Sequence, residues 1–131
     1  MADVADERPA HPFAPGQVWR YHTRPNEESS RVIIGSVDVV GRETVVSVCV
    51  TGTQIRNARR PEGIQHMLPH TPVAASALEA CVIELCGEAD VPAEFAEGYQ
   101  VWREAVEWGQ STFFTIPVAE ILTLAEQVAP Q

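Results

Sequence analysis

Hydrophobic and polar residues alternate along the first half of the chain, and this period predicts β-strands with one buried face. Trp19 and Tyr21 fall on the same side of the first run, so we expect their rings to point into the core. Gly41 and Arg42 separate the second run from the third, and a two-residue break is typical of a tight hairpin. The three runs, which predict an antiparallel meander, cover residues 17–24, 31–40 and 43–51.

The third run differs from the first because apolar residues occupy both of its faces. Val46, Val48 and Val50 share one side, while Val45 and Cys49 share the other. A strand that is apolar on both faces indicates a sheet with neighbours on both sides. We therefore expect other elements to cover both faces of this sheet.

Beyond residue 71 the apolar spacing changes to between three and four, which predicts helices. Residues 52–71 come before this change and read as a loop with a short strand over 64–68. Thr71 and Pro72 supply a capping hydroxyl and a first-turn proline for the first helix. The first two predicted helices cover residues 72–86 and 92–108, and a last helix opens at Pro117 with inward-facing residues up to Val128. A short strand over 112–116 is expected to pair with an N-terminal strand.

Strands followed by helices predict an α+β fold rather than alternating βαβ units. We expect an N-terminal antiparallel curved sheet, arranged as a meander or a partial barrel, packed by about three C-terminal helices. Residues 1–14 combine small, charged and proline residues without an apolar period, which predicts a flexible N-terminal tail. Residues 15–131 then form a single α+β domain, a length for which one hydrophobic core is usual.

The composition is typical of a globular protein, with 131 residues of which 45% are hydrophobic and 21% charged. No apolar stretch approaches the roughly 20 residues that cross a bilayer, and the first residues lack the pattern of a secretory signal. The three cysteines are an odd number, so we expect reduced thiols and a cytoplasmic location. All nine basic residues are arginine, a bias typical of GC-rich bacterial genomes, and the lack of lysine excludes Schiff-base and Walker-lysine chemistry.

Charge divides the chain into two unlike halves. Residues 15–71 hold seven arginines and five acidic residues, whereas residues 72–131 hold one arginine and ten acidic residues. The chain as a whole has a formal net charge of −9. An acidic half repels nucleic-acid phosphates and attracts basic partners. We therefore expect a protein partner with a basic surface, and neither a nucleic-acid nor a membrane partner.

Three arginines close together in a predicted loop are a candidate binding group. They are Arg56, Arg59 and Arg60. A planar guanidinium binds carboxylate or phosphate in a bidentate manner, which would suit a partner protein or a small anion. Pairing with the acidic helices of the same molecule is the alternative interpretation.

The predicted helix 92–108 supplies the second group of candidates. Its aromatic stripe of Phe95, Tyr99 and Trp102 is expected to face the core, with the glutamates opposite. Trp108 lies off this stripe, and tryptophan is enriched at binding hot spots. The binding candidates on this helix are therefore Trp108 and the acidic residues Glu97, Glu104 and Glu107. There are two alternative interpretations of the acidic residues. They could form a solvated helix face, or two of Glu94, Glu97, Glu104 and Glu107 could act as paired catalytic carboxylates.

A small ligand-binding or metal-binding domain, or an enzyme, is the competing hypothesis. Its site would lie near His66 and His70 and the Arg56–Arg60 loop, with Cys81 as a further metal ligand. Pro69 argues against a helix that would align the two imidazoles, and the chain contains no CxxC or recognised catalytic motif. We accordingly assign no catalytic residue, no metal and no cofactor. The wider site at the open end of the sheet would add Tyr21, His22 and Arg24.

Charge, size and the missing motifs together favour a non-enzymatic protein–protein interaction domain. Small acidic inhibitor or immunity-type proteins act in this way when they neutralise a basic surface. The analogy is one of charge and not of motif. A homo-oligomer that uses the edge of its sheet is a third hypothesis.

Overall fold

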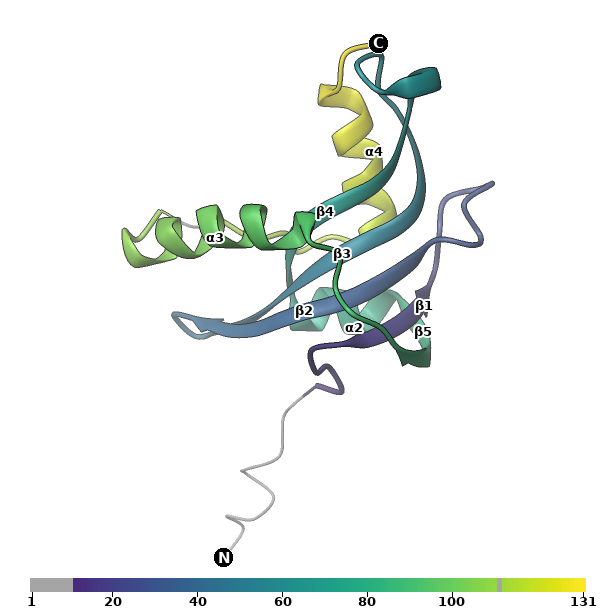
Figure 1. Cartoon of the computed structure of the whole chain (residues 1–131). Coiled ribbons are helices and arrows are strands. Elements are labelled where there is room, and N and C mark those ends of the chain that lie inside the picture. The colour runs from purple at the N-terminus through teal and green to yellow at the C-terminus, as the bar shows by residue number, and fades with distance from the viewer. Residues whose placement is uncertain (1–10, 111) are drawn as a thin grey trace, which may run out of the picture.

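A curved, five-stranded antiparallel sheet forms the centre of the computed structural model (Figure 1). The structure describes residues 11–110 and 112–131. The strands lie in the order β4-β3-β2-β1-β5. The elements are β1 (Gln17–Tyr21), β2 (Arg31–Val40), β3 (Glu43–Arg56), a 3₁₀ turn (Pro61–Gly63), β4 (Ile64–Ala74), α2 (Ala75–Cys81), β5 (Val82–Glu88), α3 (Glu94–Glu107) and α4 (Val118–Val128).

The predicted α+β class is confirmed, because the antiparallel sheet is accompanied by three helices. The hairpin between β2 and β3 has the predicted two-residue turn, with Val40 opposite Glu43. Gly41 takes the positive φ of 63° that this turn requires. The sheet is open and does not close into a barrel, since β4 and β5 form its two edges.

Helices cover both faces of the sheet, as the two-sided pattern of β3 predicts. On one face α2 and α4 bury their apolar side chains against Val46, Val48 and Val50. On the other face α3 packs Phe95 in a smaller cluster with Cys49. None of the helices in the described residues combines the length and apolarity that a membrane span needs.

The predicted helix over 72–86 is wrong, because strands occupy most of that segment. β4 continues to Ala74 with Thr71 opposite Val48, a helix follows over seven residues only, and β5 then pairs with β1. An edge strand tolerates proline, because the N–H group that proline lacks need not donate a hydrogen bond to a neighbouring strand there. Thr71 and Pro72 therefore belong to an edge strand rather than to a helix start.

The predicted strand over 112–116 is reduced to a single bridge, and its partner differs from the expected one. Phe114 bridges in parallel to Val73 of β4, and its backbone exchanges hydrogen bonds with Pro72 and Ala74. β1 is unavailable because β2 and β5 already flank it. Of the predicted tail, residues 1–10 lie outside the described residues, and Phe13 is buried with its ring 5.4 Å from that of Trp19.

Candidate interaction surface

Helix α3 is fixed to the sheet by two large side chains and projects beyond the strands (Figure 1). Phe95 and Trp102 are 7% and 8% exposed. A Cβ atom at Gly35 of β2 would lie 2.2 Å from the Phe95 ring, and one at Gly98 would lie 2.8 Å from Cβ of His70. Such contacts are far below van der Waals distance, so the close approach of α3 to the sheet depends on both glycines.

His70 of β4 lies beneath α3 among three aromatic rings. Its ring centroid is 5.4 Å from that of Phe95 and 5.9 Å from those of Tyr99 and Trp102. Its Nε2 lies 3.0 Å from the Ser47 hydroxyl. Burial lowers the pKa of His70 to about 4, so the ring is neutral near pH 7.

We expect His70 to make the stability of the fold depend on pH below neutrality. An unfolded histidine titrates near pH ~6.5, so acid protonates the unfolded chain first and lowers the free energy of unfolding between pH ~6.5 and about 4. The slope cannot exceed ~1.4 kcal/mol per pH unit, because the unfolded chain binds at most one more proton than the folded chain at this residue. Urea unfolding from pH 4 to 7.5 should show this component disappearing in His70→Gln and persisting in the control His66→Gln. Equal profiles for the two variants would contradict it.

The inner side of α3 also accounts for the one arginine of the acidic half. The Tyr99 hydroxyl donates a hydrogen bond of 2.9 Å to the Asp38 carboxylate of β2. The Arg103 guanidinium lies 3.7 Å from the same carboxylate. Arg103 is therefore directed toward the sheet, and its charge is already paired with an acid outside α3.

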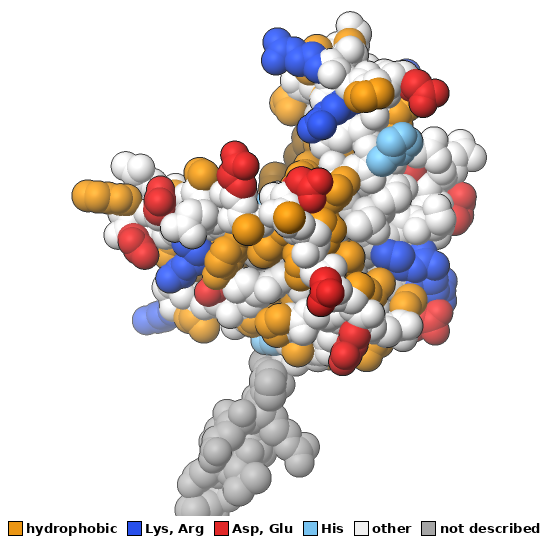
Figure 2. Space-filling model, in the orientation of Figure 1, with side chains coloured by type: hydrophobic (Ala, Val, Ile, Leu, Met, Phe, Trp, Pro, Cys, Tyr) orange, Lys and Arg blue, Asp and Glu red, His pale blue; other side chains and the backbone are white. Residues whose placement is uncertain are grey.

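The outer side of α3 presents acidic and apolar side chains together. Val101 and Trp108 are 64% and 79% exposed although both are large and apolar. Glutamates flank them at helical spacing, and acidic side chains gather on the projecting helix in Figure 2. In the described part of the chain, none of these carboxylates belongs to an ion pair. We call this surface the α3 face; it consists of Glu94, Glu97, Val101, Glu104, Glu107 and Trp108.

A groove runs beside the α3 face, between α3 and the edge strand β4. Its larger part has a volume of about 500 Å³, with Pro69 on one wall and Glu97 and Val101 on the other. It continues past Glu94 into a part of about 270 Å³ that reaches Arg60. The groove thus has glutamates on the α3 side and a mixture of apolar and uncharged polar residues on the β4 side.

Known proteins give no further guide to this surface. The chain matches no protein-family model, no curated protein and no solved structure.

The arginine group does not neutralise the α3 face. Arg56 is committed to α4, because its backbone N–H donates to Glu126 at 2.7 Å and its guanidinium lies 3.6 Å from the same carboxylate. Arg59 and Arg60 are exposed at the tip of the β3–β4 hairpin, and no ion pair of theirs occurs within the described residues. Arg60 reaches the end of the groove, whereas no arginine is among the described residues that line its larger part.

The residues of the competing metal or ligand site are not brought together. His66 is exposed with Nδ1 3.2 Å from the Thr53 carbonyl, His70 lies under α3, and Cys81 is in the core on the opposite face. Tyr21 is also in that core, with its hydroxyl 2.8 Å from Ser30. Across residues 11–110 and 112–131, no three His, Cys, Asp or Glu side chains converge on a common point as metal ligands would.

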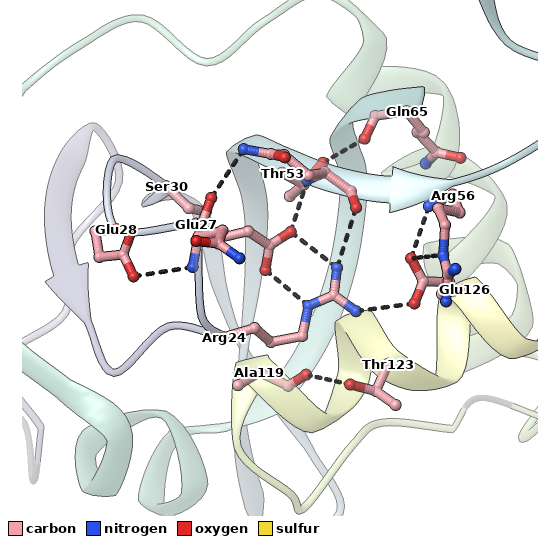
Figure 3. Close-up of polar contacts among 12 residues, drawn as sticks. Arg24, Glu27, Glu28, Ser30, Thr53, Arg56, Gln65, Ala119, Thr123 and Glu126 are labelled. Atoms are coloured by element: carbon pink, nitrogen blue, oxygen red, sulfur yellow. Dashed lines mark hydrogen bonds and ion pairs between the residues drawn. The ribbon is translucent and has the colours of Figure 1, made fainter. Parts of the chain in front are cut away.

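Arg24, the other member of that site, belongs to a buried ionic network that the sequence did not reveal (Figure 3). Its guanidinium donates two hydrogen bonds to Glu27, of 2.7 and 2.8 Å, and a longer one to Glu126 of α4. The backbone N–H of Gln54 in β3 donates to Glu27 at 2.6 Å. This network joins the β1–β2 loop, β3 and α4. No pattern distinguishes Glu27 from Glu28 in the sequence, because both lie in the same polar run.

Proposed function

We propose that this chain is a non-enzymatic protein–protein interaction domain whose α3 face binds a basic partner. The observation that carries the proposal is the α3 face itself, with four exposed glutamates around an exposed valine and tryptophan. Apolar side chains inside a charged rim are typical of binding interfaces, where tryptophan is a common anchor. The carboxylates are free to pair with a partner, since no arginine of the described chain occupies them.

The chemistry of the surface defines the partner. Arginine or lysine side chains spaced along a helix or loop would pair with the glutamates, and an apolar side chain would cover Val101 and Trp108. A second copy of the same α3 face is disfavoured by charge repulsion. The free thiols, including exposed Cys86, fit a cytoplasmic encounter, and the all-arginine basic set fits a bacterial host.

Neutralising the α3 face should abolish capture of the partner from an extract of the native host. The test variant carries Glu97→Gln, Glu104→Gln and Glu107→Gln. A control with Glu43→Gln, Glu79→Gln and Glu120→Gln loses the same charge from exposed positions elsewhere. We expect the wild type and the control to retain the same protein, and the test variant and Trp108→Ser to lose it.

The purified partner then gives a quantitative check. Its rate of association with the wild type should fall by at least ~10-fold as ionic strength rises from low to physiological, because charge attraction speeds the encounter. The test variant should show a much weaker dependence. A partner that the test variant retains as well as the control does, or a rate indifferent to salt, would exclude the α3 face as the binding surface.

A further inference from the structure

A second concave site lies on the opposite side of β4 from α3, against helix α4. It is a pocket of about 250 Å³ between β4, Phe114 and α4. Leu68, Ile121 and Leu124 line it, and Val128 stands at its rim. Leu124 and Val128 are 43% and 85% exposed, so apolar side chains of α4 remain uncovered beside the pocket.

The pocket wall contains a polar group with no partner. Thr71 is 1% exposed, and its hydroxyl is the one buried side-chain oxygen or nitrogen in the described chain without a hydrogen bond. The other buried serine and threonine hydroxyls of the described chain are bonded: Ser30 to the Thr51 carbonyl at 2.6 Å, Ser47 to Nε2 of His70 at 3.0 Å and Thr53 to the Gln65 carbonyl at 2.8 Å. An unpartnered buried hydroxyl costs free energy that a valine of the same shape would avoid.

Charge and size restrict what the pocket can hold. Among the described residues that line it, none carries a formal charge near pH 7, because the one titratable side chain is His70, whose pKa burial lowers to about 4. An ionised ligand would therefore lose its hydration without gaining a counter-ion. The volume lies below the roughly 300–1,000 Å³ of pockets for drug-sized ligands. The occupant must be small, neutral and mostly apolar.

We propose that this pocket binds a small neutral amphiphile, an apolar ring or short chain with one hydrogen-bonding group that pairs with the Thr71 hydroxyl. A 120° rotation about χ1 of Thr71 moves its hydroxyl to the position now held by the methyl group or the β-hydrogen, and this lets a hydroxyl in the pocket wall turn toward a bound molecule. The ligand then supplies the hydrogen-bond partner that the protein lacks, and covers Leu124. The proposal is independent of the α3 face, which lies across the sheet.

The test compares two probes of nearly equal shape, p-cresol and p-xylene, of which p-cresol alone has a hydroxyl. Each is titrated into the ¹⁵N-labelled full chain while backbone amide shifts are recorded. We expect p-cresol to shift the amides of Leu68, Thr71, Phe114 and α4. Thr71→Val should raise Tm, which shows that it folds, yet weaken p-cresol binding about tenfold and leave p-xylene binding unchanged. Leu124→Gln should weaken both probes.

Several results would overturn the proposal. These are an absence of shifts around the pocket, shifts confined to other surfaces, or equal binding of p-cresol to the wild type and Thr71→Val. If the amide shifts around the pocket changed with protein concentration in the absence of any probe, the pocket would be a contact surface for a second copy of the chain instead.

Discussion

Replacing Glu27 with alanine should lower the free energy of unfolding by about 3–5 kcal/mol, the range for removing one member of a buried ion pair. Glu27 is 2% exposed and accepts hydrogen bonds from both the Arg24 side chain and the Gln54 backbone. Without the carboxylate, the guanidinium and the buried amide both lose their main partner. Urea unfolding at pH 7 measures the loss.

Glu28 provides a matched control one residue away. Its exposed carboxylate accepts a single hydrogen bond, from the Asn26 backbone. Glu28→Ala should therefore cost less than about 1 kcal/mol. Equal losses in the two variants would show that the buried network does not stabilise the fold.

The pH dependence of Glu27→Ala follows from the direction of the pKa shift. Burial alone raises the pKa of Glu27, but the hydrogen bonds from Arg24 and Gln54 outweigh it and hold the pKa below its usual value. Glu27 therefore stabilises the fold above the unfolded glutamate pKa of ~4.3, and this contribution fades as pH falls through the lower folded value. The difference between the wild type and Glu27→Ala should shrink in acid. A difference that stays constant to pH 2 would contradict the shift.

Local patterns account for the parts of the fold that were predicted correctly. The β2–β3 hairpin joins strands across Gly41 and Arg42, so alternation and turn spacing alone specify it. The burial of Phe95 and Trp102 and the exposure of Glu97 and Glu104 likewise follow from the period of a single helix. These features depend on residues near one another in the chain.

The errors fall where distant segments decide the structure. Val73, Ala77, Cys81 and Leu85 recur every four residues, which fits one helix. The structure instead divides them among β4, α2 and β5, because β5 pairs with β1 more than sixty residues earlier. The spacing of apolar residues within one segment does not show that the segment pairs with a distant strand.

The candidate site was predictable to a similar extent. The glutamates and Trp108 were found from helical spacing, but the groove beside them depends on the approach of α3 to β4. That approach requires an absent side chain at Gly35 and at Gly98, and neither glycine stands out in the sequence. The sequence does not indicate the Thr71 pocket, because a threonine before a proline is typical of a helix start, whereas Thr71 lies in β4.

Gly35 should therefore control the position of the α3 face without belonging to it. A methyl group at this residue would lie 2.2–2.7 Å from three atoms of the Phe95 ring. We expect Gly35→Ala to destabilise the fold by about 1–3 kcal/mol through overpacking, although alanine suits a strand better than glycine. It should also weaken partner binding, while every glutamate of the α3 face remains present.

A double-mutant cycle with Phe95→Leu separates this contact from a general effect on β2. The smaller side chain makes room for the new methyl group, so Gly35→Ala should cost at least ~1 kcal/mol less in the Phe95→Leu background than in the wild type. Gly41→Ala is the control, because a Cβ there meets nothing within 4 Å and its cost comes from the positive φ alone. Gly41→Ala and Phe95→Leu should be additive in urea unfolding. If Gly35→Ala and Phe95→Leu were additive too, the Phe95 ring would not rest on Gly35, and the helix that carries the proposed interface would be held to the sheet by other contacts.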